Sequence, residues 1–252
     1  MVRHAVWVAV FVAGVLFAAE GKAQTQSRCA DCHFANPGSV SASHLSEWDL
    51  SGHGRKNVGC ETCHGGDPRS FEPFVAHKDI LARTNPASPV HPTNLPKTCG
   101  TCHTGPLVAF QRSKHYELLR AGNKNGPTCT TCHGEAAGNR LSPKALEGQC
   151  ASCHGAGKIA PHPEFPGRAR LADEGLREAR ALLKDARSAI ARVKDKARRA
   201  SLEQAAQQAE VPIIEATQAG HAFIYDQLDE RLTTARARIA ALFERLANPD
   251  AR

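Results

Sequence analysis

The chain has 252 residues, of which 41% are hydrophobic but only 5% are aromatic, and its formal net charge is +7. This length allows one or two domains, and so few aromatic residues leave little material for a large conventional side-chain core. All ten Cys lie between Cys29 and Cys153, each within a C-x-x-C-H unit, which excludes a disulfide framework of scattered cysteines.

The first predicted element is a signal peptide over residues 1–23. A short basic start precedes an apolar run at Ala5–Ala19, and Gly21 and Ala23 place small residues just before a cleavage point. The run has about 15 residues, fewer than the roughly 20 that a membrane-spanning helix needs. We expect export to the periplasm with a mature start near Gln24. The alternative interpretation is an uncleaved N-terminal anchor.

Residues 24–165 form the second predicted region. Gly and Pro are spread through it so evenly that no helical or alternating pattern continues for more than about three turns. This composition predicts loops and short helices.

Residues 166–252 are rich in Ala, Leu, Arg, Glu and Gln, a composition typical of helices. Steps of four and three residues define a narrow apolar seam at Ala179, Leu183, Ala186, Ile190, Val193, Ala197 and Ala200. The same rhythm continues at Ile214, Thr217, His221, Ile224, Leu228, Leu232, Ala235, Ile239, Leu242 and Leu246.

These two seams predict two or three antiparallel helices over roughly 168–200 and 202–247. Ser201 with Gln204 could cap the second start, and Pro212 could kink that helix or occupy its first turn. Because an Ala-rich seam buries little area, we expect these helices to pack against the first region or to form an oligomer or complex.

The five C-x-x-C-H units dominate the chemistry of the chain. They are Cys29-Ala-Asp-Cys32-His33, Cys60-Glu-Thr-Cys63-His64, Cys99-Gly-Thr-Cys102-His103, Cys129-Thr-Thr-Cys132-His133 and Cys150-Ala-Ser-Cys153-His154. The pattern is the signature of c-type haem attachment, in which two thiols form thioethers along one haem edge and the adjoining His ligates the iron. We therefore predict five covalently attached haem c groups, whose apolar rings would form much of the core.

Two other uses of these cysteines are less consistent with the sequence. Zinc ribbons pair two C-x-x-C units for each metal, which would leave one of five units alone, and they do not require His after every second Cys. Dithiols of the thioredoxin type need a βαβ context that a Gly- and Pro-rich region lacks. Nucleic-acid binding is also not expected, because haem propionates would offset the basic charge and no Lys/Arg block has interleaved aromatic residues.

The second axial ligands must come from histidines outside the motifs. One of the thirteen His lies in the signal peptide and five lie in the motifs, which leaves His44, His53, His77, His91, His115, His162 and His221. The supply permits His/His ligation of all five irons with two histidines to spare. His/Met ligation is excluded because Met1 is the only Met and lies in the signal peptide.

A repeated Ser-x-His element helps to rank these histidines. Ser51-Gly-His53 and Ser113-Lys-His115 each precede a haem motif, so His53 and His115 are the first candidates. His44 and His77 come next, and His221, on the apolar seam of the last helices, completes the predicted set. His91 and His162 neighbour prolines in loops and are equally typical of surface histidines.

The chain resembles multihaem cytochromes c of the group that contains hydroxylamine oxidoreductase, its tetrahaem electron acceptor and the pentahaem cytochromes of nitrite ammonification. Two stretches carry the resemblance: Trp48-Asp-Leu-Ser-Gly-His53 leading into Val58-Gly-Cys60, and Lys97-Thr-Cys99 through His103 followed by Phe110-Gln-Arg-Ser-Lys-His115. The likeness covers about residues 27 to 155. It implies closely stacked haems with mostly His/His ligation, and it implies distal positions for the two Ser-x-His histidines.

Two departures from this group bear on catalysis. No motif has Lys in place of its His, as the catalytic nitrite reductases of the group usually have, and those enzymes are much longer. Tyr116 and Tyr225 are the only tyrosines, and neither lies in a motif that matches the crosslinking Tyr of hydroxylamine oxidoreductase.

The sequence therefore predicts a mainly α protein with extensive loops. A loop-rich pentahaem cytochrome c domain at 24–165 would precede a helical hairpin or three-helix segment at 166–252. We expect outer-sphere electron transfer through low-potential haems, between a quinol-linked or soluble donor (such as a quinol dehydrogenase) and a terminal reductase or another cytochrome. The alternatives are an oxidoreductase for a small oxyanion or nitrogen compound with one five-coordinate haem, and a haem-bearing subunit of an electron-transfer complex.

Overall fold

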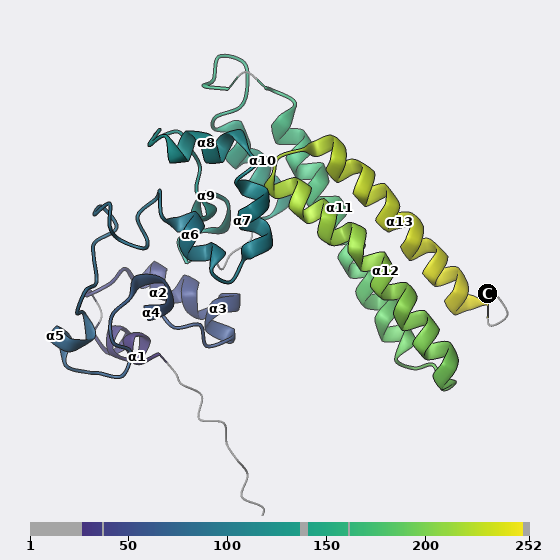
Figure 1. The fold of residues 1–252 in the computed structure, drawn as a ribbon, viewed down its shortest axis with the longest axis horizontal. Coiled ribbons are helices and arrows are strands. Elements are labelled where there is room, and N and C mark those ends of the chain that lie inside the picture. The colour runs from purple at the N-terminus through teal and green to yellow at the C-terminus, as the bar shows by residue number, and fades with distance from the viewer. Residues whose placement is uncertain (1–26, 37, 137–140, 161, 249–252) are drawn as a thin grey trace, which may run out of the picture.

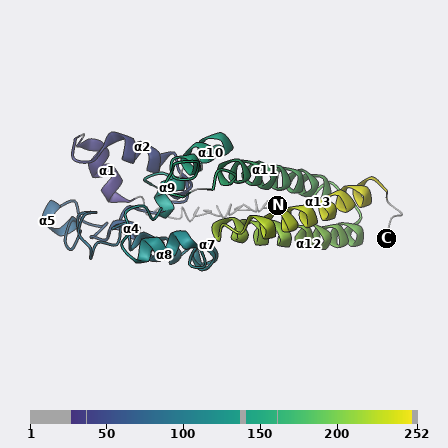
Figure 2. The ribbon, with the colours of Figure 1, turned by 90° about the horizontal axis from the view of Figure 1, so that it is seen from above.

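A computed structural model describes residues 27–36, 38–136, 141–160 and 162–248, so the predicted signal peptide lies outside the described residues. The fold is mainly α, as the sequence predicts, and β-structure in the described ranges is limited to one bridge between His154 and Ala160. Short helices gather at one end of an elongated molecule, and the long helices of the C-terminal part extend from them (Figures 1 and 2).

In the described residues, ten short helices and their connecting loops build the first part of the chain. They are α1 (Arg28–Ala35), α2 (Ala42–Asp49), α3 (Gly52–Arg55), α4 (Glu61–His64), α5 (Pro73–Ala76), α6 (Leu95–Gly100), α7 (Thr104–Phe110), α8 (Lys114–Arg120), α9 (Cys129–His133) and α10 (Pro143–Ala151). Few apolar side chains are buried here. The buried ones in the described residues are Ala30, Leu45, Leu95, Pro96, Ala109 and Leu119.

The last part is a three-helix bundle of α11 (Phe165–Ile190), α12 (Lys196–His221) and α13 (Tyr225–Ala247). Its core contains the predicted seam positions of α11 and α13, which are Ala179, Leu183, Ala186, Ile190, Leu228, Leu232, Ala235, Ile239 and Leu242. The Ala residues of this core are almost completely buried, because a side chain of one carbon lets the helix axes approach closely.

The first predicted helix end is wrong. The chain leaves α11 after Ile190 and begins α12 at Lys196, where the Asp195 carboxylate accepts the N–H of Arg198 at 2.6 Å. Asp195, and not Ser201, is therefore the cap, and Ala197 and Ala200 are exposed. The chain has to reverse direction here so that α12 can pack antiparallel to α11 and bury its own apolar residues.

The predicted helix 202–247 is divided at residues 222–224. Phe223 has a positive φ of 58° at this break, while Pro212 lies inside α12 without ending it. In α12 the buried positions are Leu202, Ala206, Ala209, Pro212, Ile213, Ala216 and Ala219, and Ile214 is 50% exposed. The predicted seam is thus displaced by one position, from Ile214 and Thr217 to Ile213 and Ala216.

The bundle is attached to the short helices through α10, which packs on α11, and α7, which packs on α12. Arg177 strengthens this junction: it pairs with the buried Asp173 at 2.8 Å and donates to the carbonyl of Leu141 at 2.7 Å. None of the described helices is long and apolar enough to span a membrane.

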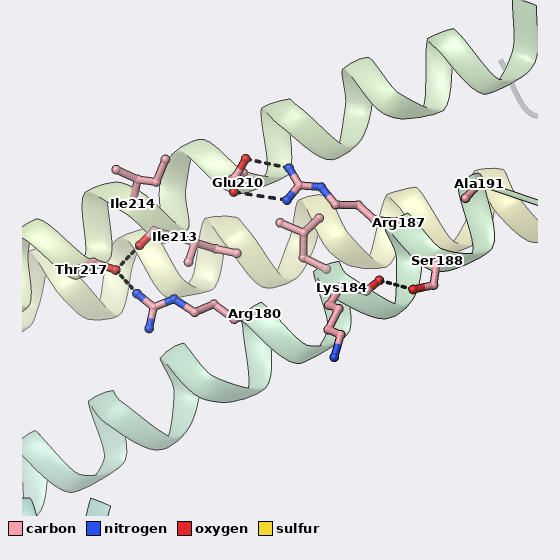
Figure 3. Close-up of a pocket in the computed structure, with 10 residues that line it drawn as sticks. Arg180, Lys184, Arg187, Ser188, Ala191, Glu210, Ile213, Ile214 and Thr217 are labelled. Atoms are coloured by element: carbon pink, nitrogen blue, oxygen red, sulfur yellow. Dashed lines mark hydrogen bonds and ion pairs between the residues drawn. The ribbon is translucent and has the colours of Figure 1, made fainter. Parts of the chain in front are cut away.

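A groove of about 550 Å³ lies between α11 and α12 (Figure 3), and its lining residues include none from a C-x-x-C-H motif. An ion pair between Arg187 and Glu210 at 2.7 Å crosses it. Arg180 donates to the Thr217 hydroxyl at 2.6 Å, which holds α11 against the last turns of α12.

Candidate functional site

Each C-x-x-C-H motif folds as a single helical turn. In the motifs of His64, His103 and His154, the backbone N–H of the His donates to the carbonyl of the first Cys at 2.9 Å. The motifs of His33 and His133 lie within α1 and α9. This turn brings two thiols and one imidazole to the same side of the backbone, as attachment of one haem requires.

The Ser-x-His element has the same local structure at both of its occurrences. Ser51 caps α3 and accepts the N–H groups of His53 and Gly54, and Ser113 caps α8 and accepts the N–H of Tyr116. Each serine also donates to the carbonyl three residues earlier, at 2.6 Å for Ser51 and 2.7 Å for Ser113. Both hydroxyls are buried. The element therefore fixes a His at the start of a short helix.

Every motif histidine lies opposite a second histidine from another part of the chain. The ring centroids are separated by 5.8 Å for His33 and His77, 6.0 Å for His64 and His44, 6.0 Å for His103 and His53, 6.2 Å for His133 and His221, and 5.9 Å for His154 and His115. The five partners are the five histidines that the sequence ranks first.

This separation matches two imidazoles that share one metal ion. A metal–imidazole bond is about 2 Å long and the ligating nitrogen lies about 1 Å from the ring centre, so two axial rings have centroids about 6 Å apart. The residues present therefore fit haem c at five places, with two thiols and an axial imidazole pair at each. We number the five sites in chain order, from the first (Cys29, Cys32) to the fifth (Cys150, Cys153).

Three of the histidines that lie opposite a motif histidine have Nδ1 hydrogen-bonded to a backbone carbonyl. His77 is bonded to Pro73 at 2.8 Å, His221 to Thr217 at 2.8 Å, and His53 to Ala136 at 3.2 Å. At His44 the Glu135 carboxylate lies 3.7 Å from Nδ1. Such contacts fix the tautomer with Nε2 free for a metal, and they are a common feature of metal-binding histidines.

The two remaining histidines differ from this set. No ring pair includes His91 among the described residues, and its Nδ1 lies 2.7 Å from the Thr93 hydroxyl. His162 lies 6.3 Å from His154, but it is exposed, stacks on Phe165 at 4.7 Å and faces the Glu164 carboxylate at 3.4 Å. The fifth site thus has another histidine, His162, close to His154, and the ring of His162 stacks on Phe165.

The thiols of consecutive motifs are neighbours. Burial and then the adjacent Cys29 raise the pKa of Cys60 to about 11, and burial and then Cys150 raise the pKa of Cys132 to about 11. Burial, followed by Cys99 and Cys102, also raises the pKa of Cys63.

A hydrogen bond between Cys99 and Cys129 raises the pKa of Cys99 and lowers the pKa of Cys129. The sites therefore follow one another in chain order. The raised values at Cys60, Cys63 and Cys132 contrast with the lowered pKa of a catalytic thiol.

Burial also keeps several of the paired imidazoles neutral. Burial lowers the pKa of His64 and His115, and it also lowers the pKa of the less buried His33 and His154. In each case a second imidazole, either the opposed ring or another neighbour, lowers the pKa further. A neutral imidazole is the form that binds a metal.

Sequence reasoning did not find the groups that support these histidines. The acceptors for His53, His77 and His221 are backbone carbonyls, which leave no trace in residue identity. Phe223, whose ring centroid lies 4.2 Å from that of His115, was also missed. Its only distinguishing feature is a positive φ, which a non-glycine sequence does not signal.

Two family models match the chain. The model for "Cytochrome c7 and related cytochrome c" matches residues 84–155, which contain the last three motifs, and the model for "Cytochrome c554 and c-prime" matches residues 14–65, which contain the first two. Comparisons with curated proteins and with solved structures gave no match. The two family matches support a multihaem c-type cytochrome with covalently bound haem c and a role in electron transfer with redox partners.

Proposed function

We propose that this chain is an exported pentahaem cytochrome c that transfers electrons by an outer-sphere route, with His/His ligation at all five irons. The proposed axial pairs are those of opposed rings: His33 with His77, His64 with His44, His103 with His53, His133 with His221, and His154 with His115. One observation carries the proposal, namely that each motif histidine has a partner ring at 5.8 to 6.2 Å.

The protein residues have three tasks in this function. The cysteines hold haem c through thioether bonds, and haem c, when bound, supplies one-electron exchange between ferric and ferrous iron. The paired histidines would both bind the iron, which would keep substrates from the metal. The carbonyls of Pro73, Thr217 and Ala136 hold the distal rings in one orientation, which limits reorganisation when the charge changes.

The order of the sites along the chain supports transfer between neighbours. Thiols of successive motifs are adjacent from Cys29 and Cys60 through to Cys132 and Cys150. Electrons could therefore pass along the sites between a quinol-linked or soluble donor and a terminal reductase or another cytochrome. We place this exchange in the periplasm, the compartment typical of both matching families.

The rival proposal is an enzyme that binds a small oxyanion or nitrogen compound at a five-coordinate haem. Such an enzyme needs one motif histidine without an opposed imidazole. The fit of two axial rings at each of the five motifs favours the electron carrier.

Mass spectrometry and electron paramagnetic resonance test the proposal. The mature protein should carry five covalent haems, and the oxidised protein should give low-spin signals that do not change when cyanide, nitrite or hydroxylamine is added. A high-spin signal that responds to one of these ligands would reveal an open iron and would favour the enzyme.

A further inference from the structure

The fifth site differs from the other four in the surroundings of its two imidazoles. In the described part of the chain, the Nδ1 atoms of His115 and His154 are the only buried imidazole nitrogens without a hydrogen-bond partner. These two residues are the opposed pair of this site, with ring centroids 5.9 Å apart. Both axial groups of one site therefore lack an acceptor for the proton on Nδ1.

Three of the other sites provide a hydrogen-bond partner for at least one imidazole, and at the second site a carboxylate lies 3.7 Å from Nδ1 of His44. Backbone carbonyls accept from His77, His221 and His53 at the first, fourth and third sites. The hydroxyl of Ser39 lies 2.8 Å from Nδ1 of His33, and the Glu135 carboxylate faces His44 at the second site. The contrast therefore separates the fifth site from all of the others.

The missing partners have a defined effect on the iron. An acceptor at Nδ1–H makes the imidazole a stronger electron donor, which stabilises the ferric state and lowers the reduction potential. Without acceptors, His115 and His154 donate less strongly. The ferrous state is then favoured at this site relative to the other four.

Apolar packing acts in the same direction. The ring of Phe223 meets that of His115 edge to face at 4.2 Å, and Phe165 lies 5.4 Å from His154. Cys150, with Leu146 and Phe165, packs against the apolar core of the three-helix bundle. An apolar surrounding disfavours the extra positive charge of ferric iron, and so raises the potential.

Phe223 has a strained backbone conformation. Its φ of 58° lies in the left-handed region, which a bulky side chain rarely adopts. Its ring also contacts Phe110, with centroids 6.4 Å apart. The turn between α12 and α13 thus supplies both His221 to the fourth site and the apolar cover of His115 at the fifth.

Charged groups of both signs lie near this site, and the Glu164 carboxylate acts on His154 itself, where it raises the pKa against the effect of burial. The Glu164 carboxylate faces His162, and Arg168 lies over the ring of Tyr225, which is itself in contact with Phe165. Glu164 is exposed, and Arg168 is paired with Asp226 and Asp229, so that solvent and counter-charges screen both of them.

We propose that the fifth site has the most positive reduction potential of the five and is where electrons collect. This inference rests on the proposed function, since it takes the fifth site to be ligated by His154 and His115. On reduction by a mediator, one electron converts one ferric iron to ferrous, and the fifth site takes up the first. A one-electron acceptor that takes the electron from the fifth site would complete the transfer.

Substitution of Phe223 in the full-length holoprotein tests this inference. Phe223→Asn and Phe223→Gln bring a side-chain carbonyl towards His115, and Asn tolerates a positive φ well. Phe223→Leu is the matched control, because it has the size of Asn and no acceptor. Potentiometric titrations, monitored by visible absorption and electron paramagnetic resonance, measure the midpoint potential of each haem reduction step.

We expect Asn or Gln to lower the most positive midpoint and to leave the other four unchanged, while Leu leaves all five in place. His115→Ala identifies the site independently: its low-spin signal should be lost from the step that is reduced first. A shift in a less positive step, or no shift with either amide, overturns the inference.

A separate result would instead contradict the ligand assignment. If His115→Ala leaves every low-spin signal intact, His115 is not an axial ligand, and the proposed function fails at this site. If His115→Ala removes a low-spin signal but from a later step, the ligand assignment stands and only the order of potentials is wrong.

Discussion

The imidazole rings of His133 and His221 lie 6.2 Å apart with their planes within 9° of each other, although His133 is in α9 and His221 is the last residue of α12. The bundle therefore reaches into the region of the C-x-x-C-H motifs. It contributes a predicted axial ligand there, and a division of the chain at residue 165 would separate this pair.

Replacement of His221 by Ala should convert one of five low-spin irons to a high-spin form. The reason is that the fourth site loses its opposed imidazole while the other four pairs keep theirs. Electron paramagnetic resonance of the oxidised protein measures the change, and added cyanide should restore a low-spin signal. His91→Ala is the control, since His91 has no opposed motif histidine in the described residues, and a high-spin signal from that variant would contradict the assignment.

Ser113→Ala should lower the stability of the holoprotein by about 1–2 kcal/mol. The hydroxyl caps α8 at Tyr116 and donates to the Phe110 carbonyl at 2.7 Å, and the residue is buried. Thermal unfolding of the variant and of Ser188→Ala, an exposed serine of α11, measures the difference. Equal midpoints for the two variants would show that the Ser-x-His cap does not stabilise this helix.

Ala186→Leu should destabilise the bundle by about 1–3 kcal/mol, because the larger side chain has no space between the closely packed helices. Ala186 is 0% exposed. Ala181→Leu introduces the same side chain at an exposed position of the same helix and should have little effect. Denaturant unfolding followed by circular dichroism compares them, and similar midpoints would contradict the packing of this seam.

Tyr225 should make the folded protein less stable in alkaline solution. Burial is the main reason that the pKa of Tyr225 is raised, so the folded state resists ionisation while the unfolded state ionises near the ordinary pKa of about 10. The contribution of neutral Tyr225 is complete below that pH and is lost as the pH rises above it, by up to about 1.4 kcal/mol for each pH unit.

Tyr225→Phe should therefore flatten the fall in unfolding free energy above this pH. Tyr116→Phe is the control, since Tyr116 is more exposed than Tyr225. Denaturant titrations at a series of alkaline pH values give the two slopes. The explanation is wrong if Tyr225→Phe loses stability as steeply as the unchanged protein.

The haem-binding chemistry of the chain could be predicted from the sequence because it depends on residue identity and on short spacings between residues. Five C-x-x-C-H units specify haem attachment within one helical turn each, and counting histidines leaves seven candidates for distal positions. The Ser-x-His repeat is also local: a serine cap fixes His53 and His115 near the start of a short helix.

Helix limits in the bundle could be predicted only in part. Periodicity identified Leu183 and Leu228 as core positions, but it extended one helix beyond Ile190 and passed over the break at Phe223. The positions of such chain reversals depend on how the three helices pack together. In an Ala-rich segment, the apolar pattern also fits almost equally well when the predicted buried positions are shifted by one residue.

The pairing of histidines was decided by tertiary structure alone. His53 precedes the His64 motif in the chain but lies opposite His103, and His77 lies opposite His33. An axial partner must approach from the far side of a haem, where the backbone next to a motif does not reach. Sequence by itself determined which groups are candidates to bind haem, and the packing of distant helices determined which two imidazole rings lie opposite each other at each motif.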